Sequence, residues 1–261
     1  MRGFAERSRA ARRTTAAAVS VLPVVMTWSH DAQAYRPFDG TDAAVADPEE
    51  FEIELGPAGL LREGSDRTLI APALVLNLGV FENWEAVLQG QAETALPPAT
   101  ARTAVVGNGA FLKGVLRQGT LQDKPGPSVA TEFGMLLSGI NDEAGIGGSW
   151  AAIVSYRLSP NVTIHFNAET ALTRQQHGDV FLSTIAEGPV NWTVRPVAEV
   201  LYEREFGAFD TVSGLLGAIW QVREDIAVDV GVREGRLNDR SLTELRLGVT
   251  FGFPLWGARE P

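Results

Sequence analysis

The sequence lacks cysteine, contains no long apolar run and has few basic residues, and each absence narrows the class of protein. Without cysteine among its 261 residues, the chain forms neither disulfide bonds nor thiolate zinc sites. A membrane-spanning helix needs about 20 consecutive apolar residues, and the sequence has no such stretch. The 22 lysines and arginines stand against 32 acids, for a formal net charge of −10. We therefore expect no nucleic-acid partner.

The first 34 residues have the pattern of a signal peptide. Five arginines between Arg2 and Arg13 precede an apolar stretch over residues 16–28, and Ala32-Gln33-Ala34 has the small-x-small form of a cleavage site. We expect export and cleavage after Ala34, so that the mature chain begins at Tyr35. An amphipathic or disordered N-terminus is the alternative.

Residues 35–49 contain proline, glycine and aspartate but show no hydrophobic periodicity. They predict an irregular lead-in on the periplasmic side. Asp39, Asp42 and Asp47 suggest a calcium loop, but the spacing lacks the full ligand set and its terminal glutamate. Turn chemistry explains these residues better, and we expect neither a metal nor a cofactor.

From residue 50 onward, stretches of about ten residues alternate between apolar and polar side chains. Phe51, Ile53 and Leu55 share one face of the first stretch, while Glu52 and Glu54 share the other. Such alternation predicts β-strands with one apolar face. Twelve stretches are found, at residues 50–57, 68–80, 84–94, 108–118, 128–139, 147–158, 162–173, 178–187, 191–204, 210–222, 226–235 and 241–253.

Strand length and connection length favour a membrane barrel over a soluble sandwich. Ten residues cross a bilayer at a tilt, whereas soluble strands average about five or six. We expect short turns at 82–84, 159–161, 187–191 and 223–225, and longer connections at 57–67, 94–107, 139–145 and 234–241, as in outer-membrane barrels. The sequence thus predicts an all-β fold, a closed antiparallel transmembrane barrel of about 12 strands (10–14) over residues 50–256, with a tail at 257–261. Pro72 and Pro196 fall inside strands, where they mark either bulges or misplaced boundaries.

Three segments resemble a known family. Residues 37–46, 195–200 and 217–223 are similar to an uncharacterised family of proteobacterial outer-membrane β-barrels, akin to the proposed transporters of the MetA pathway of phenol degradation. The resemblance implies a bacterial outer-membrane location and uptake of small aromatic or apolar compounds. It supplies no catalytic motif.

By alternation, twelve charged or titratable side chains should face the lumen. They are Lys113, Arg117, Glu132, His165, Glu169, Arg195, Glu199, Glu203, Asp229, Arg233, Glu244 and Arg246. Because acids and bases both occur, we expect them to pair across a narrow interior, and the alternative is a substrate-selective ring. A barrel of twelve strands predicts a narrow or partly plugged passage.

An enzyme is the less favoured interpretation. His165 could act as a base with Glu169 on the same face of its strand, but no nucleophile motif accompanies them. As a metal pair, these two residues lack a third ligand. We expect no catalytic site.

The sequence therefore favours a narrow passive channel or transporter for small molecules. We expect a monomer in the bacterial outer membrane, in contact with its lipids and inserted by the barrel-assembly machinery. A structural or adhesive barrel without a pore, and an exported soluble β-protein that binds an apolar ligand, are the alternatives.

Overall fold

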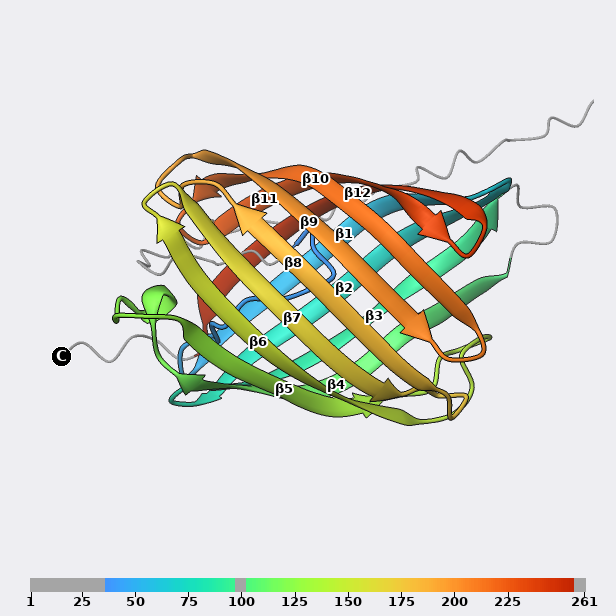
Figure 1. Cartoon of the computed structure of the whole chain (residues 1–261), viewed down its shortest axis with the longest axis horizontal. Coiled ribbons are helices and arrows are strands. Elements are labelled where there is room, and N and C mark those ends of the chain that lie inside the picture. Colours follow the sequence, from blue (N-terminus) through green and yellow to red (C-terminus); the bar gives the residue numbers. More distant parts are fainter. Residues whose placement is uncertain (1–35, 97–101, 256–261) are drawn as a thin grey trace, which may run out of the picture.

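The computed structural model describes residues 36–96 and 102–255, and most of them lie in twelve antiparallel strands (Figure 1). The strands are β1 (Glu50–Glu63), β2 (Asp66–Phe81), β3 (Trp84–Leu96), β4 (Thr103–Arg117), β5 (Ser128–Leu136), β6 (Gly147–Ser159), β7 (Val162–Leu172), β8 (Gly178–Glu187), β9 (Val194–Glu205), β10 (Phe209–Arg223), β11 (Ile226–Leu237) and β12 (Arg240–Pro254). A short 3-10 helix, η1 (Thr120–Gln122), lies between β4 and β5. The predicted signal peptide, its cleavage site, Trp256 and the tail at 257–261 lie outside the described residues.

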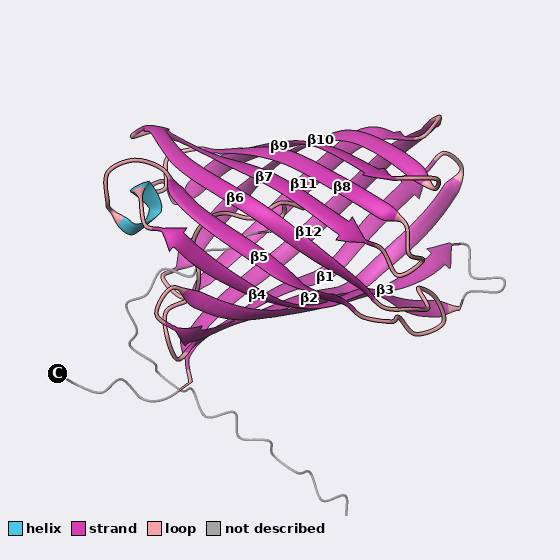
Figure 2. Cartoon of the chain, turned by 60° about the horizontal axis from the view of Figure 1, so that its bottom comes forward, coloured by secondary structure: helices cyan, strands magenta, loops and turns pink. Residues whose placement is uncertain are grey.

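The sheet closes on itself. Each strand pairs with its neighbours in sequence, and β1 pairs with β12 to complete the ring (Figure 2). Closure leaves no strand edge unpaired. The predicted twelve-stranded closed antiparallel barrel is confirmed. In the part of the chain that the structure describes, no helix has the length and apolar character needed to span a bilayer.

The two faces of the sheet differ as the alternation predicts. On β11, Asp229 is 2% exposed, whereas its neighbours Val228 and Val230 are 38% and 42% exposed. The buried side chains are those that point into the lumen, where further side chains surround them. The outward positions are rich in leucine, valine and aromatic residues. An apolar outer face around a polar interior is the arrangement of a transmembrane barrel.

Two connections that the sequence predicts to be long are in fact tight turns. Strands β1 and β2 are joined by Gly64-Ser65 alone, and β11 and β12 by Asn238-Asp239. Gly64 and Asn238 have positive φ angles of 60° and 51°, which two-residue hairpin turns require. The predicted short turns near 82–84, 159–161 and 223–225 are confirmed. On the same end as those turns, the η1 connection between β4 and β5 is longer.

The two strand prolines are accommodated in different ways. Pro72 lies where the register of β2 and β3 shifts, between Ile70 and Ala73, so it sits in a bulge. Pro196 pairs in regular register with Ala218, and its carbonyl accepts a hydrogen bond from the Gly188 N–H, beyond the end of β8. Its missing N–H therefore faces the side on which β8 has already ended, and no strand pairing is lost.

Residues 36–49, called the luminal segment below, contain no helix or strand, as predicted. Residues 36–46 lie inside the barrel and not on the periplasmic side (Figure 1), whereas residues 47–49 are exposed where the segment leads into β1. Phe38 packs against Val197, Ile219 and Ala227. Ala43 is completely buried in a second cluster. The segment lacks periodicity because its partners are the inward side chains of many strands, so no regular pattern in its sequence shows its location.

Candidate functional site in the barrel lumen

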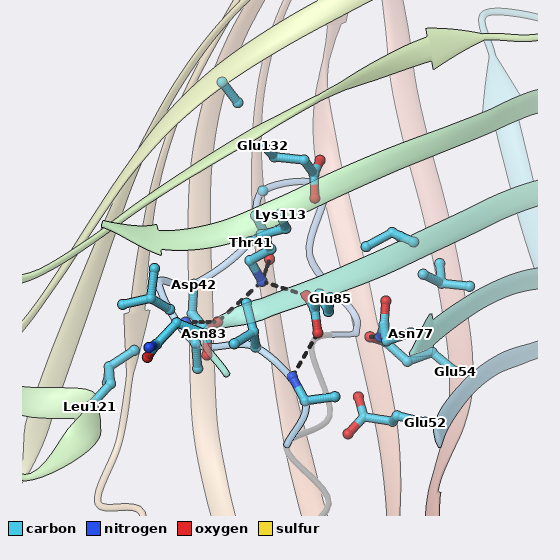
Figure 3. A pocket seen from close by; sticks show the side chains of 18 of the residues that line it. Thr41, Asp42, Glu52, Glu54, Asn77, Asn83, Glu85, Lys113, Leu121 and Glu132 are labelled. Atoms are coloured by element: carbon cyan, nitrogen blue, oxygen red, sulfur yellow. Dashed lines mark hydrogen bonds and ion pairs between the residues drawn. The ribbon is translucent and has the colours of Figure 1, made fainter. Parts of the chain in front are cut away.

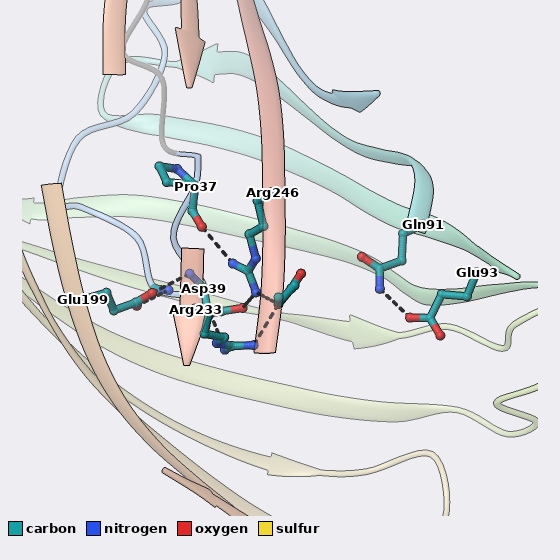
Figure 4. Close-up of polar contacts among 9 residues, drawn as sticks. Pro37, Asp39, Gln91, Glu93, Glu199, Arg233 and Arg246 are labelled. Carbon is teal, nitrogen blue, oxygen red and sulfur yellow. Dashed lines mark hydrogen bonds and ion pairs between the residues drawn. The ribbon is translucent and has the colours of Figure 1, made fainter. Parts of the chain in front are cut away.

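One end of the luminal segment is held by two arginines. Arg246 on β12 donates to Asp39 at 2.9 Å and to the Pro37 carbonyl at 2.8 Å (Figure 4). Arg233 on β11 also donates to Asp39, and both arginines bond Glu244, at 3.3 and 2.8 Å. Burial alone would raise the pKa of Asp39, but the guanidinium groups of Arg246 and Arg233 outweigh it and bring the pKa below its ordinary value. The arginines thus hold an ionised aspartate inside the barrel.

Glu199 on β9 binds the backbone of the same segment. Its two carboxylate oxygens accept the N–H groups of Asp39 and Gly40, each at 2.9 Å. A Cβ on Gly40 would lie 2.3 Å from the Ser183 hydroxyl and 2.8 Å from the Asn167 amide. A larger residue at this close approach would require these two side chains to shift, so the segment and the barrel wall are matched in shape.

Further along the segment, Lys113 on β4 is the central contact (Figure 3). Its ammonium group lies 3.5 Å from Asp42 and 3.3 Å from Glu85, and it donates to the Thr41 hydroxyl at 3.0 Å. Glu85 also accepts the Ala46 N–H at 2.7 Å. One lysine therefore joins the segment to a carboxylate of the wall.

A serine, a histidine and a carboxylate lie next to one another on the adjacent strands β6, β7 and β8. The Ser155 hydroxyl is 2.7 Å from Nδ1 of His165, whose Nε2 is 3.8 Å from Glu187, and Arg195 pairs with Glu187 at 3.2 Å. The order resembles that of a hydrolase triad. However, Ser155 is completely buried and its hydroxyl already accepts the Ala43 N–H at 2.9 Å. This group therefore holds the luminal segment.

The pairing of His165 with Glu169 that an enzymatic interpretation would require does not form. The two residues are four positions apart on one strand, and a rise of about 3.3 Å per residue separates them by about 13 Å. Glu169 lines a cavity instead. Arg117 also differs from its prediction, because a bulge between Val115 and Arg117 shifts the alternation. Arg117 is exposed at the end of β4 and donates to two proline carbonyls of the next connection.

The remaining predicted residues face the interior, but they do not form one network. Arg233, Glu244 and Arg246 meet at Asp39. Arg195 and Glu199, on the same strand, bind different partners. The residues Lys113, Glu132, Glu203 and Asp229 are distributed over four strands. The luminal segment, predicted on the periplasmic side, is the element that contacts Lys113, Glu199, Arg233 and Arg246.

Three residues of the site are absent from the sequence prediction. Ser155 lies on the inward face of β6 but is small and uncharged, so the search for charged side chains passes over it. Glu187 ends β8, at a position that the sequence prediction shares between the strand at 178–187 and the turn at 187–191. Ser183 has the same inward parity as Glu187 on that strand. The alternation contains the signal for all three.

A cavity of about 670 Å³ lies beside the luminal segment. Its wall is formed by that segment and by side chains of β1 through β8. The lining includes eleven aspartates and glutamates, but only two basic residues, Arg36 and Lys113. Within the described ranges, no group of three histidine, cysteine, aspartate or glutamate residues is placed to hold a metal ion. The lumen thus combines an internal segment with a cavity lined mainly by acidic side chains.

Comparisons with known proteins show other barrels of the same fold. No family model and no curated protein sequence matches the chain. Among solved structures, an outer membrane channel from Pseudomonas putida F1 is similar with a TM-score of 0.60 and 7% identity, over 80% of this chain and 97% of that one. The NanC porin gives a TM-score of 0.54 with 8% identity, over 77% and 98%. The KdgM porin gives 0.51 with 10% identity, over 77% and 99%. At such low identity, the similarity shows a shared fold.

Proposed function

We propose that the chain is a passive channel for small molecules in the bacterial outer membrane. The observation that supports this proposal is the acidic cavity of about 670 Å³ inside a barrel with an apolar outer face. A barrel that served only as a structural element would need no internal space of this size. The fold is the one found in outer-membrane channels and porins. The luminal segment narrows the passage, so only small solutes should cross.

The location and partners follow from the same proposal. Apolar outward side chains require lipid, and insertion of such a barrel requires the barrel-assembly machinery. We expect a monomer, since the ring closes within one chain. If cleavage occurs after Ala34, the mature chain begins two residues before Pro37, which lies in the lumen. N-terminal sequencing of the exported protein should begin at Tyr35, and a start at Met1 would contradict export.

The alternative functions have less support. The resemblance to MetA-pathway transporters implies aromatic or apolar cargo, but Phe38 and Phe181 are the only aromatic side chains among the residues that line the cavity. An adhesive barrel would use long loops, whereas β1–β2 and β11–β12 are joined by two residues each. A soluble protein would not expose this many leucine and valine side chains. The lumen's serine–histidine pair gives no support for an enzyme, because the hydroxyl is buried.

Liposome swelling tests the channel directly. Proteoliposomes that contain the purified chain should swell in small solutes and fail to swell in solutes too large for the cavity. A variant that lacks residues 37–46 should swell faster and admit larger solutes. Heat-modifiable gel mobility provides the control that both proteins are folded barrels. If neither folded protein permits swelling, the channel proposal is wrong and a sealed barrel is indicated.

A further inference from the structure

Most of the charged side chains that line the cavity are acidic. Eleven carboxyl side chains line it, and the ammonium group of Lys113 is already shared by Asp42 and Glu85. A cluster of acids on an open surface would simply be hydrated and would indicate no ligand. Inside a barrel, low-dielectric walls concentrate the field of such a cluster and raise the local concentration of counter-ions.

Glu52 on β1 gives an independent indication. It is 8% exposed, it lines the cavity, and neither a hydrogen bond nor an ion pair is found for its carboxylate among the described residues. Its neighbour on the same face, Glu54, accepts a hydrogen bond from Asn77 at 3.1 Å. Figure 3 shows Glu52 beside the same space as Glu54, Glu85 and Glu132. A buried acid with no protein partner, placed among other acids, is stabilised if a cation comes to it.

From these two observations we infer that the cavity selects small cationic solutes, such as organic amines, over anions. The inference rests on the proposed channel function and names the class of its substrate. The space has the size of a small-molecule site, which is about 300–1,000 Å³. Since the described residues offer no metal-chelating cluster, the expected guests are hydrated monovalent ions and amines, held by the field of the cavity and not by direct coordination.

The inference separates this chain from one of its structural neighbours. A KdgM structure is described as a complex with oligogalacturonate, and galacturonate units carry one carboxylate each. The cavity described above would repel such an anion. The common fold therefore accommodates opposite choices of substrate charge, which the inward side chains determine.

The reversal potential in planar bilayers tests the inference. Under a KCl gradient, the wild-type channel should favour K⁺ over Cl⁻ by about tenfold, as expected for a focused acidic field. When K⁺ is replaced with tetramethylammonium, the reversal potential should keep the same sign, because the channel still favours the cation. At an alkaline pH that keeps both carboxyl groups ionised, Glu52→Gln and Glu132→Gln should each reduce the preference severalfold, because each then removes one charge at nearly constant volume. Glu234→Gln is the matched control, since Glu234 is exposed on β11 and bonds Thr243 outside the cavity.

The outcomes distinguish this inference from the channel proposal. A channel that conducts without preferring cations overturns the inference and leaves the channel intact. A cation preference that is unchanged in both Glu52→Gln and Glu132→Gln also overturns the inference. The selectivity would then arise from charged residues outside this cavity. If neither the wild type nor the variant lacking residues 37–46 conducts, the channel proposal fails and the inference fails with it.

Discussion

The same strands form the outer and inner faces of the barrel, but the two faces place different requirements on their side chains. Outward positions on β11 and β12, such as Val230 and Leu247, need only be apolar, because lipid accepts any apolar shape. Inward positions hold particular partners: Arg246 binds Asp39, and Glu199 binds two backbone N–H groups of the luminal segment. The outer face is therefore defined by polarity, and the inner face by the identity of each residue.

The largest effect is expected from a charge on the outer face. Leu247 is the central residue of β12 and is 42% exposed. Leu247→Arg should destabilise the folded barrel by about 2–4 kcal/mol, since an arginine near the bilayer midplane loses hydration. Leu247→Ala is the control and should fold nearly as well as the wild type. Equal folding yields of both variants in lipid, measured by heat-modifiable mobility, would show that this face is not in lipid.

On the inner face, a change of charge should act on the luminal segment and leave the barrel folded. Asp39→Asn weakens the charged hydrogen bonds from Arg233 and Arg246, which still share Glu244. The docking of the segment should weaken by about 1.5–3 kcal/mol. Hydrogen exchange of the backbone amides of residues 39–43 measures this loss of docking stability.

Asp47→Asn is the control for this change, because Asp47 is an exposed residue of the same segment. It should leave the protection of these amides unchanged. If Asp39→Asn has no larger effect than Asp47→Asn, the arginine pair does not hold the segment.

A change of shape tests the same contact without a change of charge. Gly40→Ala places a Cβ 2.3 Å from the Ser183 hydroxyl, and overpacking of this kind costs about 1–3 kcal/mol. Adding Ser183→Gly should restore part of the protection, because it removes the nearest clashing atom. A Gly40→Ala protein with wild-type exchange would mean that the segment does not lie against β8.

The smallest effect is a pH dependence. Because the pKa of Asp39 in the docked state lies below 3.8, its contribution is complete above pH 3.8 and is lost as the pH falls through the lower docked value. The ratio of protection factors between wild type and Asp39→Asn should therefore stay constant from neutral pH down to 3.8 and then shrink. A ratio that shrinks already near neutral pH would contradict an ionised Asp39 held by arginines.

The fold was largely predictable because alternation encodes the strand count and the inward face. All twelve predicted strands form. The connections after β1 and β11 are shorter than predicted, because residues such as Gly64 and Asn238 allow turns that composition alone does not reveal, and a bulge turns Arg117 away from the lumen. The site was less predictable. Alternation identifies residues that face inward, but partners such as Ser155 for His165 depend on the register between strands. The location of residues 36–49 depends on contacts with many strands, so no local pattern indicates it.

In the proposed channel, the lumen is a passage narrowed by residues 36–49. Single-channel conductance in planar bilayers tests it most directly, with the full chain compared to the variant lacking residues 37–46, both verified as folded barrels. Both proteins should conduct, and the shortened one should have the larger unitary conductance. Equal conductances would show that the segment does not narrow the path, and the absence of conductance in both would show that the barrel is not a channel.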